Sequence, residues 1–214
     1  MAQSKDLYDA ILNGDAKKAR ATTEAALAAG VPPMELIQES MVSAMDEVGR
    51  LFEAEEYFVP ELLLSARAMK SSLDLLKPLL SASGQKMSAR VVIGTVKGDL
   101  HDIGKNIVAS MLEGGGFEVI DLGTDVSPES FVAAVKERNP QFVCMSALLT
   151  VTMPSMKTTI DALKTAGLRT QVKVLVGGAP VTTQYAKEIG ADGFSENANG
   201  AVSLVKNLLA GEAA

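Results

Sequence analysis

The stretch RVVIGTVKGDLHDIGKNIVASMLEGG, residues 90–115, decides the fold of the second half of this chain. It starts with a β-branched apolar run, passes through a loop with two glycines and continues with the apolar spacing of a helix. A buried strand, a short loop and a helix form the first part of a strand–helix–strand unit. The stretch therefore predicts a parallel α/β arrangement if the same pattern recurs along the chain.

The pattern does recur. Further apolar or β-branched runs occupy residues 117–123, 140–148, 172–178 and 191–195. Helical patterns lie between or after them, at residues 128–139, 153–167 and 197–211. Alternating strands and helices predict a parallel sheet that helices cover on both faces. We therefore expect residues 88–214 to form a Rossmann-like, flavodoxin-like, doubly wound sheet of five parallel strands.

The first half has a different pattern, because helical spacing runs from residue 1 to about residue 82. Its four segments cover residues 6–15, 15–30, 32–57 and 59–80, with Asp15 as an N-cap and prolines in the first turn of the third segment. Four amphipathic segments with short links predict a four-helix bundle. The small polar residues of SASGQKMSA (81–89) predict a linker, so the expected domains are residues 1–84 and 88–214.

Composition and charge narrow the functional classes. The chain has 214 residues, 47% of them hydrophobic, which is enough for a packed core. The net charge is −6, and neither half has a basic excess that would attract nucleic acid. The first residues lack the apolar core of a signal peptide, and no apolar run is long enough to span a membrane. With one cysteine, Cys144, predicted to be a buried, inert thiol, we expect a cytoplasmic protein.

Residues with functional chemistry follow three of the predicted strands. They are Gly98, Asp99, His101 and Gly104 after the first strand, Ser146 after the third, and Gly177 and Gly178 after the fourth. Parallel sheets bind ligands beyond the carboxyl ends of their strands. We therefore expect these three loops to converge on one site.

Three familiar interpretations of the loop fit poorly. A phosphate-binding P-loop needs four residues between its glycines and a hydroxyl after its lysine, but five residues separate Gly98 from Gly104 and Asn106 follows the lysine. A two-metal hydrolase needs several histidines, and the chain has one. An acyl-transfer site needs a nucleophile, but Cys144 falls within a strand and no serine lies in a nucleophile elbow. A structural surface histidine stays an alternative.

One function requires a single histidine, which is axial ligation of a metal that a macrocycle already holds. The macrocycle supplies the other ligands, and the protein adds one imidazole. A carboxylate beside that imidazole, here Asp99, would orient it and raise its basicity. Glycines would let the backbone approach a bulky cofactor closely.

The motif Asp99-Leu100-His101-Asp102-Ile103-Gly104 resembles the Asp-x-His-x-x-Gly signature of cobalamin-binding domains that bind the cofactor base-off with histidine on. Two later elements also match this family, Ser146-Ala147-Leu148 and Gly177-Gly178, and residues 192–202 resemble its last cofactor loop. Residues 45–70 resemble the helical cap of cobalamin-dependent methionine synthase and of small corrinoid methyl carriers.

The resemblance implies a role for each matching residue. His101 would be the axial ligand of cobalt, hydrogen-bonded by Asp99, and Ser146 would extend this relay. The resemblance also implies a slot for the nucleotide tail of the cofactor, lined by Leu148, Gly177 and Gly178. The remaining cofactor contacts that it implies are Gly98, Asp102, Ile103, Gly104, Thr150, Ser195, Asn197 and Ala198.

The helical half would then be a cap over the upper face of the cobalt. Phe52 and Val59 match the family positions above the bound methyl group, whereas we expect Phe58 and Leu63 to belong to the core of the bundle. Because methyl donor and acceptor both need access to the cobalt, the cap must move, and residues 83–89 should permit this rearrangement.

The chain length then selects among the functions of this family. Methionine synthase needs folate and homocysteine domains, a mutase needs a catalytic barrel, and light-sensing regulators need a DNA-binding domain. The resemblance therefore implies a corrinoid methyl carrier of a multi-component system, which is not a complete enzyme by itself. Its expected partners are a substrate-specific methyltransferase, a second methyltransferase that uses tetrahydrofolate, coenzyme M or a similar acceptor, and a reductive activase. The methyl donor could be methanol, a methylamine, a betaine or a methoxyaromatic compound. A cobalamin-binding sensor or storage module is the alternative.

Overall fold

The computed structural model describes residues 2–83 and 87–211. The chain divides into two compact units, one of residues 1–88 and 110–117 and the other of residues 89–109 and 118–214. The predicted linker falls in part on residues 84–86, which lie outside the described residues. Each unit is described by itself.

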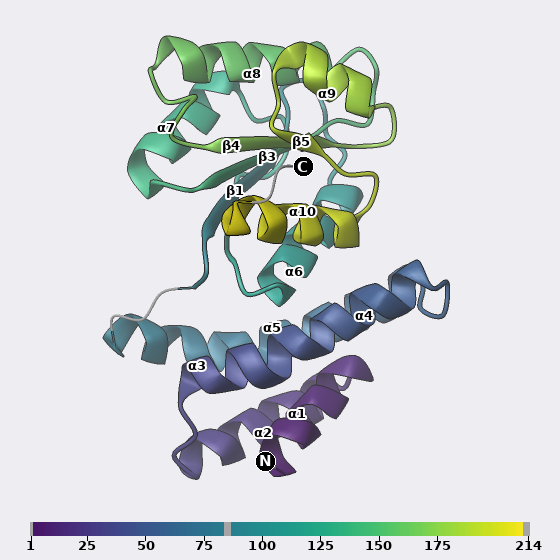
Figure 1. The fold of residues 1–214 in the computed structure, drawn as a ribbon, viewed down its shortest axis with the longest axis vertical. Coiled ribbons are helices and arrows are strands. Elements are labelled where there is room, and N and C mark those ends of the chain that lie inside the picture. The colour runs from purple at the N-terminus through teal and green to yellow at the C-terminus, as the bar shows by residue number, and fades with distance from the viewer. Residues whose placement is uncertain (1, 84–86, 212–214) are drawn as a thin grey trace. The chain divides into compact units, whose positions relative to one another are not determined.

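The first unit is helical, as the sequence predicts (Figure 1). Its elements are α1 (Ala2–Leu12), α2 (Ala16–Ala28), α3 (Pro33–Glu35), the π-helical turn η1 (Leu36–Val42), α4 (Ser43–Glu53) and α5 (Val59–Ser83). The backbone stays helical from α3 through η1 to α4, so these three elements correspond to the third predicted segment. Asp15 caps α2 as expected, because its carboxylate accepts a hydrogen bond from the Lys18 amide at 2.9 Å.

The prediction that Phe58 and Leu63 belong to the bundle core is wrong. Phe58 is 61% exposed and Leu63 is 44% exposed, while Leu62 is buried. Phe58 precedes the first residue of α5, where helical spacing does not yet apply, and its amide is capped by the Glu61 carboxylate at 2.9 Å. Leu63 lies one position away from the buried stripe that begins at Leu62, so it turns outward.

The second unit contains the predicted five-stranded parallel sheet. Its strands are β1 (Arg90–Thr95), β2 (Glu118–Asp121), β3 (Phe142–Ser146), β4 (Lys173–Gly177) and β5 (Gly193–Phe194), in the order β2-β1-β3-β4-β5. Every pairing is parallel. Figure 1 shows α7 (Pro128–Arg138), α8 (Pro154–Thr165) and α9 (Thr183–Ile189) on one face, and α6 (Ile103–Gly114) and α10 (Ala198–Ala210) on the other. This is the doubly wound, flavodoxin-like architecture.

Helix α9 is an element that the sequence analysis missed. It is only seven residues long, which is too short for a clear helical period. Its end signals are nevertheless present in the sequence. The Thr182 hydroxyl accepts a hydrogen bond from the Tyr185 amide at 3.1 Å, and Gly190 ends the helix with a left-handed φ of 80°.

The core between the sheet and helices α7, α8 and α9 is apolar and includes Phe131, Val143, Met156, Ile160 and Val174. Cys144 is buried in β3, and burial raises the pKa of its thiol to about 12. Among the described residues, no helix combines the length and the apolar character that a membrane crossing requires.

Cys144 should therefore resist thiol reagents in the folded protein. Its raised pKa leaves almost no reactive thiolate at pH 8, and the fold blocks access. We expect an aromatic disulfide reagent to react at least about 100-fold more slowly with the native protein than with the protein in denaturant. Equal rates in the two states would contradict the burial of this thiol.

Candidate functional site

The histidine loop, residues 97–102, joins the carboxyl end of β1 to α6. Strand β1 lies between β2 and β3, and β4 follows β3. The loops after β1, β3 and β4 are therefore neighbours at one edge of the sheet, as the sequence predicts. This edge includes the switch point between β1 and β3, where the direction of strand succession reverses and where doubly wound sheets bind their ligands.

The buried carboxylate of Asp99 organises this edge. Oδ1 of Asp99 lies 2.8 Å from Nδ1 of His101 and accepts a hydrogen bond from the His101 amide at 3.1 Å. Oδ2 accepts hydrogen bonds from the Thr152 hydroxyl at 2.7 Å and from the amides of Leu148 at 2.8 Å and Leu149 at 3.3 Å. The carboxylate thus joins the loop after β1 to the loop after β3.

These hydrogen bonds keep Asp99 ionised. Burial raises the pKa of its carboxyl, but the hydrogen bonds from Thr152, Leu148 and His101 outweigh burial and hold the pKa well below its usual range. An ionised Asp99 can only accept hydrogen bonds. Nδ1 of His101 must therefore carry the proton that it shares with Asp99.

His101 is held by its backbone as well as by its ring. Its carbonyl oxygen accepts a hydrogen bond from the buried Thr95 hydroxyl at 2.8 Å, and its amide is bound to Asp99. The side chain is nevertheless 51% exposed. With the proton on Nδ1, the lone pair of Nε2 is available, and no described residue forms a hydrogen bond with Nε2. This is the tautomer that binds a metal through Nε2.

Exposed apolar side chains occur on both sides of His101 in the sequence and in the loop after β3. Leu100 is 74% exposed and Ile103 is 76% exposed, and Val151 in the loop after β3 is 79% exposed. Such a concentration of exposed apolar residues is typical of a surface that binds a ligand. Within the described part of the chain, no group of three or more His, Cys, Asp or Glu side chains is arranged to hold a metal ion. The donor set therefore fits a metal that arrives in a largely apolar macrocycle better than a bare ion.

The structure differs from the sequence prediction for the relay hydroxyl. Ser146 ends β3, between Thr95 and Gly177 in register, but its hydroxyl is not among the described partners of Asp99. Thr152 occupies that position instead, and its side chain also donates to the Leu149 carbonyl at 2.8 Å. Thr152 is a site residue that sequence reasoning missed. The only signal was a second hydroxyl residue in the same loop, after Thr150.

The surroundings of the predicted glycines differ in whether they require glycine. At Gly178, with a φ of 123°, a Cβ would lie 1.9 Å from the Ala147 carbonyl oxygen, so only glycine permits this contact between the loops after β3 and β4. At Gly177, a Cβ would lie 3.3 Å from the Ser195 carbonyl oxygen. At Gly104, a Cβ would meet nothing within 4 Å. The protein alone therefore imposes no need for glycine at position 104, which fits space reserved for a ligand.

Three other predicted residues form hydrogen bonds at the starts of helices. The Asp102 carboxylate accepts a hydrogen bond from the Asn106 side chain at 3.1 Å in the first turn of α6. The Asn197 side chain caps α10 by accepting a hydrogen bond from the Gly200 amide at 2.8 Å, and the Ser195 hydroxyl donates to the Asn197 carbonyl at 2.8 Å. These bonds give each of the three residues a structural role beside any contact with a cofactor.

The remaining predicted contacts lie in both units. Ile103 and Thr150 are exposed at the carboxyl edge of the sheet, whereas Ala198 is buried in the first turn of α10. Phe52 and Val59 belong to the helical unit, where Phe52 is partly buried and Val59 is exposed. The structure thus brings Asp99 and His101 into contact and leaves the roles of the other predicted residues as proposals.

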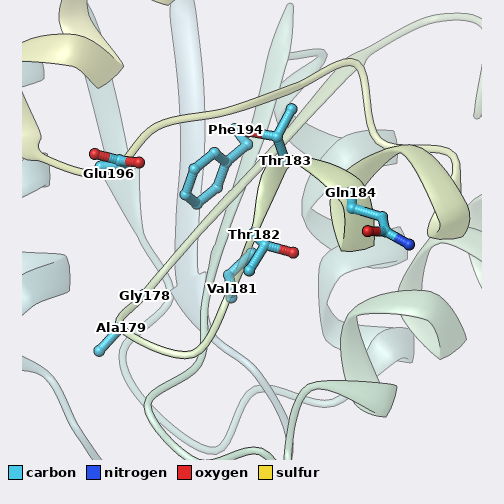
Figure 2. Close-up of a pocket in the computed structure, with 8 residues that line it drawn as sticks. All are labelled: Gly178, Ala179, Val181, Thr182, Thr183, Gln184, Phe194 and Glu196. Atoms are coloured by element: carbon cyan, nitrogen blue, oxygen red, sulfur yellow. The ribbon is translucent and has the colours of Figure 1, made fainter.

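A pocket lies between the loop after β4 and the end of β5, with a volume of about 470 Å³ (Figure 2). Its lining residues are Gly178, Ala179, Val181, Thr182, Thr183, Gln184, Phe194 and Glu196. Only Gly178 is shared with the predicted cofactor contacts. The pocket therefore adjoins the predicted cofactor contacts at Gly178.

Comparisons with known proteins identify the family of the chain. Residues 89–203 match the model of a B12 binding domain, and residues 3–77 match a second model that is also described as a B12 binding domain. The chain is 46% identical over 203 residues to trimethylamine corrinoid protein 1 of Methanosarcina acetivorans, covering 94% of each chain. It is 42% identical over 204 residues to dimethylamine corrinoid protein 3 of the same organism, covering 95% of each.

A solved structure is also similar. A chain of the methanol:cobalamin methyltransferase complex of Methanosarcina barkeri has a TM-score of 0.89 and 31% identity, with 99% of this chain and 81% of that chain covered. Fold, histidine and comparisons together define a B12-binding protein with an N-terminal helical region. The chain belongs to the corrinoid proteins of methyltransferase systems, and its cofactor is cobalamin or a related corrinoid.

The Thr152 hydroxyl should contribute measurably to the stability of the site. Thr152→Val keeps the shape of the side chain but removes a donor from the buried carboxylate, so we expect the free energy of unfolding of the apoprotein in urea to fall by about 1–3 kcal/mol. Thr152→Ser should retain most of the wild-type stability because it keeps the hydroxyl. If Thr152→Val is as stable as the wild type, this hydrogen bond does not support Asp99.

Proposed function

We propose that this protein carries a methyl group on a corrinoid cobalt between two methyltransferases. The observation that carries the proposal is the contact between Asp99 and His101, which leaves Nε2 of an exposed imidazole free to bind cobalt. The similarity to trimethylamine and dimethylamine corrinoid proteins supports it over most of the chain.

His101 would hold the cofactor as an axial ligand in place of the dimethylbenzimidazole of the cofactor. When bound, the corrinoid would supply the chemistry of methyl transfer at its cobalt. Asp99 would fix the tautomer and orientation of the imidazole, and Thr152 would fix Asp99. The charge on Asp99 would also raise the basicity of the imidazole and strengthen its bond to the metal.

Exposed apolar residues would contact the corrin ring around this ligand. Leu100, Ile103 and Val151 are the most exposed of them, and the open space at Gly104 suits close approach of a large ring. We propose that Leu148, Gly177 and Gly178 line the slot for the nucleotide tail, and that Ser195, Asn197 and Ala198 are further contacts of the cofactor. Ser146, Thr150, Gly98 and Asp102 stay proposed contacts of the cofactor.

The helical half would form the cap, as a domain of residues 1–84 that precedes a cofactor domain of residues 88–214. Phe58, Val59 and Leu63 are all exposed, so apolar side chains gather on the surface where α5 begins. Such a surface supports a role in covering an apolar ligand. Movement about residues 83–89 would open the cobalt to its partners.

The proposed partners are a substrate-specific methyltransferase, a second methyltransferase and a reductive activase. Two of the relatives are named for trimethylamine and dimethylamine, so methylamines are the first donors to test. We propose a cytoplasmic location, because reduced cobalt requires a reducing compartment. The comparisons give no support to a sensor or storage function.

The function can be tested with the purified protein loaded with a corrinoid. It should pass methyl groups from a methylamine to an acceptor when both methyltransferases are present, and omission of the protein should stop transfer. If the protein binds the corrinoid but transfers no methyl group from methylamines, methanol or methoxyaromatic donors, a sensor or storage module would be favoured instead.

His101→Ala should leave the fold intact and weaken binding of the corrinoid. The side chain is half exposed, so its loss should not disturb the core. We expect the affinity for the corrinoid to fall by at least about 10-fold. Loss of a residue that only hydrogen-bonds a metal ligand already costs about this much, and loss of the ligand itself should cost no less. Lys157→Ala, which removes an exposed ion pair in α8, is the control and should bind normally. Unchanged affinity of His101→Ala would contradict the ligand assignment.

The cap can be tested with two matched variants of α5. Val59 and Leu79 are 42% and 43% exposed, and about 30 Å of helix separates them. If the cap shields the bound methyl group, Val59→Ala should increase the rate at which light removes that group, by about 2-fold or more, whereas Leu79→Ala should not. Phe52→Ala should act in the same direction as Val59→Ala. Equal photolysis rates in the wild type and all three variants would argue against a cap.

A further inference from the structure

A second carboxylate contacts the histidine loop from outside the Asp99–His101 pair. Asp125 lies between β2 and α7, in the segment 122–127. Its Oδ1 accepts a hydrogen bond from the Gly98 amide at 2.8 Å, and its own amide donates to the Asp99 carbonyl at 2.9 Å. Asp125 therefore holds the loop at two consecutive residues, because its carboxylate binds the Gly98 amide and its amide binds the Asp99 carbonyl.

The backbone of Asp125 is in an unusual conformation that makes this possible. Its φ is 53°, in the left-handed region, which is uncommon for a residue other than glycine although Asp tolerates it. Gly98, its partner, is also left-handed, with a φ of 85°. Two left-handed residues in contact define the path of the loop immediately before Asp99.

The contacts of Asp125 are additional to those that hold its segment on the sheet. The Thr95 amide donates to the Gly123 carbonyl at 2.9 Å, and the Val126 amide donates to the Thr95 carbonyl at 2.9 Å. Val96 and Val126 also form a parallel bridge. Since the segment is anchored to β1 on both sides of Asp125, the Asp125 carboxylate is not needed to attach it.

The only cation paired with Asp125 among the described residues is Lys97, whose Nζ lies 3.1 Å from Oδ1 and 3.1 Å from Oδ2. Both side chains are well exposed, so this ion pair contributes little to stability. The hydrogen bond from the Gly98 amide, followed by Lys97, lowers the pKa of the Asp125 carboxyl and keeps it an acceptor.

We propose that Asp125 is a positioning residue for corrinoid binding, which fixes the Gly98–Asp99 backbone so that the Asp99 carboxylate meets the imidazole of His101. The inference rests on the proposed function, because it concerns how the same ligand is held. Asp125 does not contact His101 in the described contacts and acts through Asp99.

Two substitutions distinguish the effect of losing the Asp125 carboxylate from the effect of its left-handed backbone conformation. Asp125→Gly removes the acceptor but accepts a left-handed φ, whereas Asp125→Asn keeps an oxygen for the Gly98 amide and tolerates the same φ. Ser127→Ala is the control in the same segment, because it removes the hydrogen bond from the Ser130 amide to the Ser127 hydroxyl without touching the histidine loop.

The readouts are cobalamin affinity, the share of cobalt(II) that carries a protein nitrogen in electron paramagnetic resonance, and hydrogen exchange of the Gly98 amide in the apoprotein. Asp125→Gly should lower affinity by roughly 10-fold and reduce the nitrogen-bound share, with faster Gly98 exchange. Asp125→Asn should restore most of the affinity and most of the nitrogen-bound share. Ser127→Ala should match the wild type in its nitrogen-bound share, even if the variant unfolds more easily.

The outcomes distinguish this inference from the proposed function. If the wild type binds cobalamin through a protein nitrogen and Asp125→Gly does so equally well, the role of Asp125 is wrong. If Asp125→Gly and Ser127→Ala lose ligation to the same degree, the effect is general destabilisation and the inference is also overturned. If the wild type itself has no protein nitrogen on cobalt, the proposed function fails first.

Discussion

The buried charge of Asp99 is the constraint on which this site depends. An ionised carboxylate without solvent is stable only if hydrogen bonds replace the lost water. Here the replacements come from two loops, since His101 follows β1 while Leu148, Leu149 and Thr152 follow β3. The parallel pairing of β1 with β3 is what brings these loops together. The sheet topology and the chemistry of the imidazole are therefore linked through one side chain.

The same carboxylate distinguishes the two nitrogens of His101. Nδ1 is bound to Asp99, whereas Nε2 belongs to a half-exposed ring and has no partner among the described residues. One histidine would then be sufficient, because a corrin ring would bring its own nitrogen ligands for the cobalt. The exposed side chains of Leu100, Ile103 and Val151 are suited to contact an apolar ring. Exposed apolar residues of this kind often mark a surface that binds a ligand.

Local patterns in the sequence predicted much of this. Alternating runs predicted the sheet, and a carboxylate two residues before a histidine in a short loop predicted their contact. Predictions failed where a result depends on the path of the chain in space. Among the described contacts, Thr152, and not Ser146, donates to Asp99 because of how the loop after β3 turns. The contact of Asp125 with Gly98 was not among the predictions, because it joins two segments that are far apart in the sequence. Phe58 was misplaced because it precedes the first residue of α5, and Leu63 because it lies one position away from the buried stripe.

Because the chain contains one histidine, isotope labelling can test whether His101 binds the cobalt. The protein would be produced with ¹⁵N-labelled histidine, loaded with unlabelled cobalamin and reduced to cobalt(II). In electron paramagnetic resonance, a ¹⁴N axial ligand splits each cobalt line into a triplet and a ¹⁵N ligand splits it into a doublet. If His101 binds the cobalt, labelling should convert the triplet into a doublet. A triplet that persists in the labelled protein would show that the nitrogen is not from His101, and would contradict the assignment of His101 as the ligand of the cobalt.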